Sequence, residues 1–275
     1  MDMKITATEV NNLRKSTGAG MMDCKKALVE ADGDHEKAIE ILRKKGQKVA
    51  ANRAERDSTE GVVLLSINEV KSKGILISLN CETDFVAKNE DFLNFANEVL
   101  KIAINVNSKN ELLGSNFGDL SISDKLIEQT GIIGEKIEIG NFQKLTGKYI
   151  GGYVHAGSKI GAMVALSDST TASEEVSKNV AMQVAAMNPL ALNQNLVDPS
   201  IIEKETEIIK EQLKKEGRPE NIIDNIIVGK LNRFYKDNTL VKQSFIKDTK
   251  VSVEDYVKSK DNNLSITSFV RVSLV

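Results

Sequence analysis

Apolar residues recur at helical spacing three times within the first 46 residues. The recurring positions are Val10 and Leu13 in the first segment, Cys24, Ala27, Leu28 and Ala31 in the second, and Ala38, Ile41 and Leu42 in the third. Glycine-containing breaks separate the three segments, and Thr6-Ala7-Thr8-Glu9 has the spacing of a capping box before the first one. Residues 1–50 are therefore predicted to form a three-helix module with Cys24 in its core. Gly46 stands where the C-terminal glycine of the third helix is expected.

The next segment, residues 51–59, lacks an apolar stripe. It is polar and charged, and it precedes a run of β-branched and aliphatic residues that begins at Val62. We interpret it as a linker, with a helical conformation as the alternative.

The rest of the chain contains what looks like a repeat. Val62–Ile67 and Ile75–Leu79 are strand-like runs, and the helix after them has the apolar stripe Phe92, Phe95, Ala96, Val99 and Ala103. In the second copy, the strand-like runs 153–155 and 162–166 precede Thr171-x-x-Glu174, which has capping-box spacing. The order of two strands and one helix, found twice, predicts two related α+β core subdomains over residues 60–147 and 148–275. Further strands near 136–145 and 264–274 are expected to complete their sheets.

Residues 198–236 interrupt the second copy with two helical patterns. Asp198 precedes Pro199, which is the arrangement of a capping residue followed by proline at the first helical position. Gly217 ends the first helix and Pro219 starts the second, so an inserted antiparallel helical hairpin is predicted.

Composition narrows the possible functions. Lys and Arg number 37 against 39 Asp and Glu, for a net charge of −2, so a direct nucleic-acid partner is not expected. No segment approaches the roughly 20 apolar residues of a membrane span, and residues 1–6 lack the apolar stretch of a signal peptide. We therefore expect no membrane partner and a cytoplasmic protein with reduced thiols.

Residues with catalytic potential are few. The two cysteines and two histidines make no CxxC or HExxH pattern, so neither a cofactor nor a metal is expected. Cys81 with His155 is conceivable as a thiol pair, although a lone Cys and a lone His are far more often structural. A thiol enzyme and a general peptide-binding or assembly adaptor remain as alternatives, and a pull-down would distinguish one dominant partner from many clients.

One loop segment is unusual on physical grounds. Asn80-Cys81-Glu82-Thr83-Asp84-Phe85-Val86-Ala87-Lys88 places Phe85 and Val86 between a strand and a helix. Taken alone, the segment favours a ring that folds back onto the core, and a ring that faces a partner is the alternative.

Three ordered motifs change that balance. Thr83-Asp84-Phe85-Val86, preceded by Cys81-Glu82, closely resembles the signature of the elongation factor Ts family, whose members exchange guanine nucleotide on elongation factor Tu. Residues 13–28 and Tyr153-x-His155-x-Gly157 resemble two further markers of this family. The resemblance covers nearly the whole chain. It implies an α+β protein with an N-terminal three-helix domain like ubiquitin-associated (UBA) domains, two core subdomains and an inserted helical hairpin, which is the order that the patterns predict.

The resemblance also implies a mechanism and the residues that carry it. The partner would be elongation factor Tu, both GDP-bound and nucleotide-free, and the chain would act by binding rather than as an enzyme. Asp84 and Phe85 would enter the GTPase domain and dislocate its Mg²⁺. The implied partner-binding residues are Arg14, Met21, Met22, Thr83, Asp84, Phe85, Val86 and His155. A core position for Met21 or Val86, and a hydrogen bond of His155 to its own hairpin, remain as alternatives.

Overall fold

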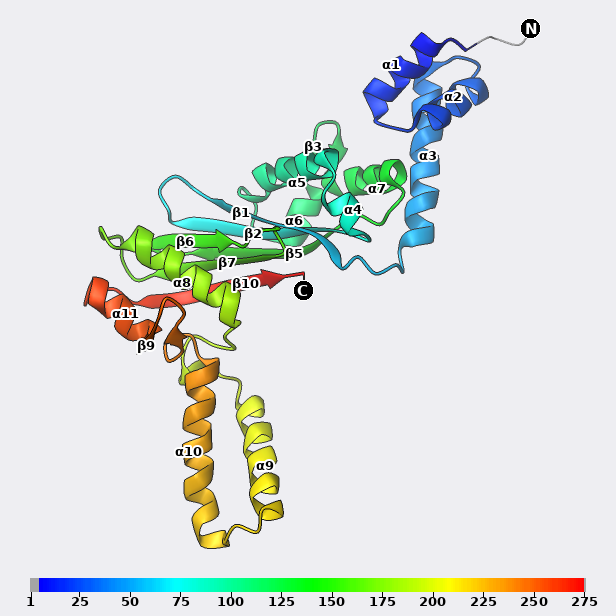
Figure 1. Ribbon diagram of the computed structural model, residues 1–275. Helices are drawn as coiled ribbons and strands as arrows, with labels where there is room; N and C mark the ends of the chain where they lie inside the picture. The colour runs from blue at the N-terminus through cyan, green and yellow to red at the C-terminus, as the bar shows by residue number, and fades with distance from the viewer. Residues whose placement is uncertain (1–4, 275) are drawn as a thin grey trace. The chain divides into compact units, whose positions relative to one another are not determined.

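The computed structural model describes residues 5–274 (Figure 1). These residues form two compact units. Unit 1 contains the described residues up to Leu64, then Ile77–Phe142 and Leu274, and unit 2 contains Leu65–Leu76 and Gln143–Ser273. Residues 1–4 and 275, at the outer ends of the first and last predicted domains, lie outside the described residues.

Unit 1 begins with three helices, α1 (Ala7–Thr17), α2 (Met21–Glu30) and α3 (His35–Arg53). The capping box is confirmed, because Thr6 accepts a bond from the Glu9 backbone and the Glu9 carboxylate accepts one from Thr6 N. The predicted stripes form one core, in which Cys24 is fully buried. Its members are Val10, Leu13, Ala19, Cys24, Ala27, Leu28, Ala31 and Ala38.

The third helix does not end at Gly46, so that prediction was wrong. Helix α3 continues to Arg53, and Gly46 lies inside it against Gly131 of α7 (Ile122–Ile133). A Cβ added at Gly131 would lie 2.4 Å from Gly46 Cα. The two glycines therefore allow the backbones of α3 and α7 to approach closely, and the sequence does not distinguish this use of glycine from a helix end.

A three-stranded sheet has the order β1 (Glu60–Ile67), β2 (Lys73–Cys81), β5 (Glu138–Thr146), so the strand predicted near 136–145 is confirmed. Between β2 and β5 the chain forms α4 (Asp84–Ala87), α5 (Glu90–Ala103), α6 (Lys109–Gly114), the short strands β3 (Asn116–Phe117) and β4 (Leu120–Ser121), and α7. All five residues of the predicted α5 stripe are buried.

Unit 2 contains an antiparallel sheet with β7 (Ile160–Leu166) between β6 (Tyr149–Val154) and β10 (Ile266–Ser273). The final strand thus completes this sheet, as predicted. Helix α8 (Ser173–Met187) follows β7 and shares a core with that sheet and with α11 (Val253–Lys260). The remaining elements are the 3₁₀ helix η1 (Gln194–Leu196) and the strands β8 (Ser244–Phe245) and β9 (Asp248–Ser252).

The second predicted capping box, at Thr171, was wrong. Helix α8 begins at Ser173 without a side-chain cap. Instead, polar groups of the preceding turn bond to Ser173. Its Oγ accepts a hydrogen bond from Thr170 N at 2.9 Å and donates one to Asp168 O at 3.1 Å. Local side-chain bonds of this kind compete with capping.

The helical hairpin is confirmed as α9 (Pro199–Lys215) and α10 (Glu220–Asn238), which run side by side in opposite directions (Figure 1). Asp198 caps α9 by accepting a bond from Ser200 N, with Pro199 at the first helical position. The pair has a small core of its own, made of Ile209, Leu213, Ile223 and Ile227. Within residues 5–274, no helix has both the length and the apolar content needed to cross a bilayer.

Candidate partner-binding site

The signature segment forms a single helical turn, α4, directly after β2. Thr83 is its N-cap in extended conformation and accepts a bond from Val86 N at 3.4 Å. Phe85 is 82% exposed on this turn. The interpretation in which its ring folds back onto the core is therefore wrong. Val86 is half-buried, and the half-exposed Asp84 carboxylate pairs with Lys88 Nζ at 2.6 Å, which raises the pKa of Lys88.

A carboxylate from a distant part of unit 1 holds the base of this turn. Glu135, just after α7, accepts three hydrogen bonds: from Thr83 Oγ1 at 2.7 Å, Thr83 N at 3.0 Å and Glu82 N at 3.2 Å. The Thr83 hydroxyl thus donates to Glu135 while it accepts from Val86. One side chain joins the carboxylate to the cap of α4.

The neighbouring Glu82 points to a second set of partners. Both its oxygens lie 2.8 Å from Arg53 Nη1 at the end of α3, and Oε1 accepts from Lys136 N at 2.6 Å. Burial alone would raise the pKa of Glu82, but the hydrogen bonds from Lys136 and Arg53 outweigh burial and lower it. Glu82 is therefore held in its charged form, and residues 82–83 are bonded reciprocally to residues 135–136.

The thiol of Cys81 is fully buried behind the same turn. It donates to Thr83 O at 3.2 Å. Its exposed fraction is 0%, so no surface of this thiol is open to a substrate. Cys81 acts in the structure as a core residue, which argues against the thiol-enzyme alternative.

The N-terminal candidates lie at the junction of α1 and α2. Arg14 is exposed in the last turn of α1, and Met21 and Met22 open α2 with exposed fractions of 53% and 63%. A core position for Met21 is thereby excluded. Two exposed methionines side by side form an adaptable apolar surface.

His155 lies in the turn that joins β6 to β7. Its ring is exposed, and Nδ1 lies 2.9 Å from Tyr153 Oη. Its backbone N donates to Ile160 O at 2.8 Å. The predicted alternative, a histidine bonded to its own hairpin, therefore describes the geometry correctly. The ring also borders an open groove of about 340 Å³ with Met182, Ile246 and Arg271, and burial lowers the pKa of Arg271.

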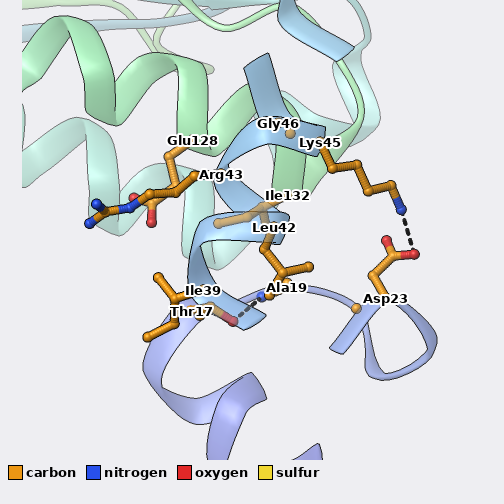
Figure 2. A pocket seen from close by; sticks show the side chains of 12 residues that line it. Thr17, Ala19, Asp23, Ile39, Leu42, Arg43, Lys45, Gly46, Glu128 and Ile132 are labelled. Atoms are coloured by element: carbon orange, nitrogen blue, oxygen red, sulfur yellow. Dashed lines mark hydrogen bonds and ion pairs between the residues drawn. The ribbon is translucent and has the colours of Figure 1, made fainter. Parts of the chain in front are cut away.

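One hollow of unit 1 lies between α3, α7 and the loop after α1, and offers about 40 Å³ of space for water, well below the roughly 300 to 1,000 Å³ of small-molecule sites. Figure 2 shows Leu42, Ile39 and Ile132 in its wall and the Lys45–Asp23 ion pair, at 2.5 Å, beside it. Across residues 5–274, no cluster of three His, Cys, Asp or Glu side chains could hold a metal ion.

The candidate residues therefore fall into three sets: the α1–α2 junction, α4 with its cap, and the β6–β7 turn. The sequence did not reveal the residues that hold α4 and His155 in place, which are Glu135, Glu82, Arg53 and Tyr153. Tyr153 and Glu82 had a local signal, because Tyr153 opens the motif that contains His155 and Glu82 directly precedes Thr83 in the signature. Glu135 comes to Thr83 through the fold, 52 residues further along the chain.

Comparison with known proteins decides the family. A family model described as Elongation factor TS matches residues 82–275. The chain belongs to the elongation factor Ts family. Elongation factor Ts of Christiangramia forsetii is 59% identical over 271 residues, which cover 98% of this chain and 99% of that protein. Elongation factor Ts of Flavobacterium psychrophilum is 57% identical over 270 residues, with 98% of each chain covered. Elongation factor Ts of Chlorobaculum tepidum is 40% identical over 284 residues, which cover 98% of this chain and 99% of that protein. The chain is thus a translation elongation factor, and its signature turn α4 opens the matched region.

Proposed function

We propose that this protein binds elongation factor Tu and promotes the exchange of GDP for GTP. The observation that supports this most directly is the exposure of Phe85, 82%, on a turn whose base is fixed by hydrogen bonds. An exposed ring on a fixed base is suited to insertion into another protein. Membership of the elongation factor Ts family supplies the partner.

The proposed mechanism is a wedge. Asp84 and Phe85 enter the GTPase domain of elongation factor Tu between two helices near the bound Mg²⁺, and Val86 and Thr83 support them. Burying a phenylalanine side chain yields roughly 1.5 to 3 kcal/mol, which can offset the strain of moving those helices. Displacing the helices disturbs the ligands of the ion. Because Mg²⁺ neutralises the phosphates, its loss weakens the hold on GDP.

The energy required is modest. A thousandfold faster release needs the barrier lowered by roughly 4 kcal/mol, at 1.36 kcal/mol per decade. Coupling is reciprocal, so the protein binds nucleotide-free partner more tightly than GDP-bound partner by the factor with which it weakens GDP binding. No bond is made or broken by this chain, which therefore works as an exchange factor and not as an enzyme, without a cofactor of its own.

The other two sets of residues add affinity in this proposal. Arg14, Met21 and Met22 contact the partner from the N-terminal helices, and His155 contacts it from unit 2. The same proposal includes a UBA-like domain over residues 1–50, a linker at 51–59, and two related core subdomains over 60–147 and 148–275. It also places the protein in the cytoplasm, with no direct contact to nucleic acid or membrane.

The test is a release assay. Elongation factor Tu loaded with fluorescent GDP is mixed with excess unlabelled GDP, with or without the protein, and the fluorescence decay is followed. We expect release to accelerate with protein concentration up to a plateau. An unchanged decay at all concentrations would overturn the proposed function.

A further inference from the structure

The signature turn, α4, is too short to be a stable helix by itself. Helix α4 has only four residues, and nucleating a helical turn fixes several backbone dihedrals for a single hydrogen bond. Phe85, at 82% exposure, contributes little burial to hold the turn. The order of this segment therefore depends on the buried Ala87 and on the groups bonded to its base.

Those groups converge on one carboxylate. Glu135 Oε2 accepts from Glu82 N and Thr83 N, two consecutive backbone donors, and Oε1 accepts the Thr83 hydroxyl proton. Bonds to an ionised acceptor are about twice as strong as neutral ones. With its proton held by Glu135, the Thr83 hydroxyl keeps a lone pair directed at Val86 N, which is the capping bond of α4.

We infer that Glu135 is a positioning residue for nucleotide exchange, which holds α4 so that Asp84 and Phe85 are presented in one orientation. This inference rests on the proposed function. Glu135 acts through Thr83. Because its carboxylate already orders the turn, less conformational entropy is lost when the partner fixes the ring.

The decisive variant is Glu135→Gln, because it keeps the size of the side chain. If the amide oxygen accepts the two backbone bonds, the amide nitrogen must face Thr83 Oγ1 and donate to it, so the hydroxyl proton loses its acceptor. We expect GDP release at saturating protein to slow by roughly tenfold. Affinity for nucleotide-free elongation factor Tu should change less than about threefold, since the other contacts remain, and the melting temperature should stay within a few degrees.

Two further measurements separate positioning from a general structural role. Amide hydrogen exchange of the free protein should become faster at residues 86–88 in Glu135→Gln and stay unchanged in the rest of unit 1. In a double-mutant cycle, Glu135→Gln should cost less in a Thr83→Val background than alone, because the two residues share a bond. The matched control is Glu111→Gln in the same unit. Glu111 accepts Asn107 N at 2.8 Å at another turn, and its loss should leave release unchanged.

The outcomes are distinguishable. If Glu135→Gln releases GDP as fast as the parent while Phe85→Ala is slow, the positioning role is overturned and the proposed function stands. A variant that fails to fold, or one whose exchange at residues 86–88 matches the parent, also overturns the positioning role. If the unmodified chain does not accelerate release, both proposals fall.

Discussion

Two phenylalanines seven residues apart show two ways of placing a ring. Phe92 lies in α5 within an apolar stripe and is 1% exposed, whereas Phe85 lies in α4 and is 82% exposed. Phe92 is fixed by what surrounds its ring. Phe85 is fixed through the residues that precede it. The backbone and hydroxyl of Thr83 bond to Glu135, and Glu82 pairs with Arg53. A core ring thus stabilises the fold, while an anchored surface ring leaves its apolar area for another protein.

The largest effect should follow from removing the core ring. Phe92→Ala should destabilise the protein by roughly 3 to 5 kcal/mol, because it leaves a cavity in unit 1. Phe85→Ala should melt within a few degrees of the parent, because little buried area is lost. Thermal unfolding followed by circular dichroism compares the two, and similar melting losses would abolish the distinction between them.

A second effect concerns the helix that carries Arg53. Gly131→Ala places a Cβ 2.4 Å from Gly46 Cα, so α3 and α7 must move apart. We expect a loss of roughly 1 to 3 kcal/mol by denaturant unfolding. Gly229→Ala is the matched control, since it lies in α10 with nothing within 4 Å, and it should be neutral or stabilise by up to about 1 kcal/mol. An equal response of the two glycines would contradict the close contact.

The sequence predicted elements with a clear period and missed uses of single residues. The stripes of α1, α2 and α5 follow from periodicities of apolar residues that are buried as expected, and β5 and β10 lie where strands were predicted. The helix end predicted at Gly46 was wrong because a glycine at a helix end and a glycine at a helix crossing look alike in sequence. The predicted capping box at Thr171 was wrong because the Ser173 hydroxyl forms the hydrogen bonds of this turn.

For the site, the candidate residues had a signal in the sequence, but Glu135 and Arg53, which hold the segment before α4, did not. Phe85 stood out as a large ring in a loop, yet the residues alone favoured a ring folded back onto the core, which was wrong. Glu135 is one glutamate among many until the fold brings it to Thr83. Long-range polar contacts have no period along a chain, so no local pattern reveals them.

A third effect should depend on pH. The pKa of Glu82 is lowered below its ordinary value of 4.5. Its contribution to stability is therefore complete above that value and is lost as pH falls through the lower pKa of the folded state. Glu82→Gln should cost on the order of 1 to 2 kcal/mol at pH 7 and less at pH 3. Urea unfolding of parent and variant across this range gives the difference, and a cost that is independent of pH would rule out a charged Glu82.

The smallest effect should come from the exposed pair on α4. Lys88→Ala removes the bond to Asp84, but solvent screens an exposed ion pair of this kind, so the pair contributes little to stability. The melting temperature should change by no more than a degree or two. A larger loss would mean that α4 is held by this pair more than by Glu135.

The central claim, that the exposed ring works on the partner's magnesium site, is tested most directly by release of fluorescent GDP from elongation factor Tu with saturating Phe85→Ala. With Mg²⁺ present, release should be slower than with the parent protein by about tenfold or more, because the other surfaces still bind while the helices stay in place. With Mg²⁺ chelated, the deficit should shrink, since the ion is already gone. A variant that releases GDP as fast as the parent, or a deficit that is the same with and without Mg²⁺, would contradict the account.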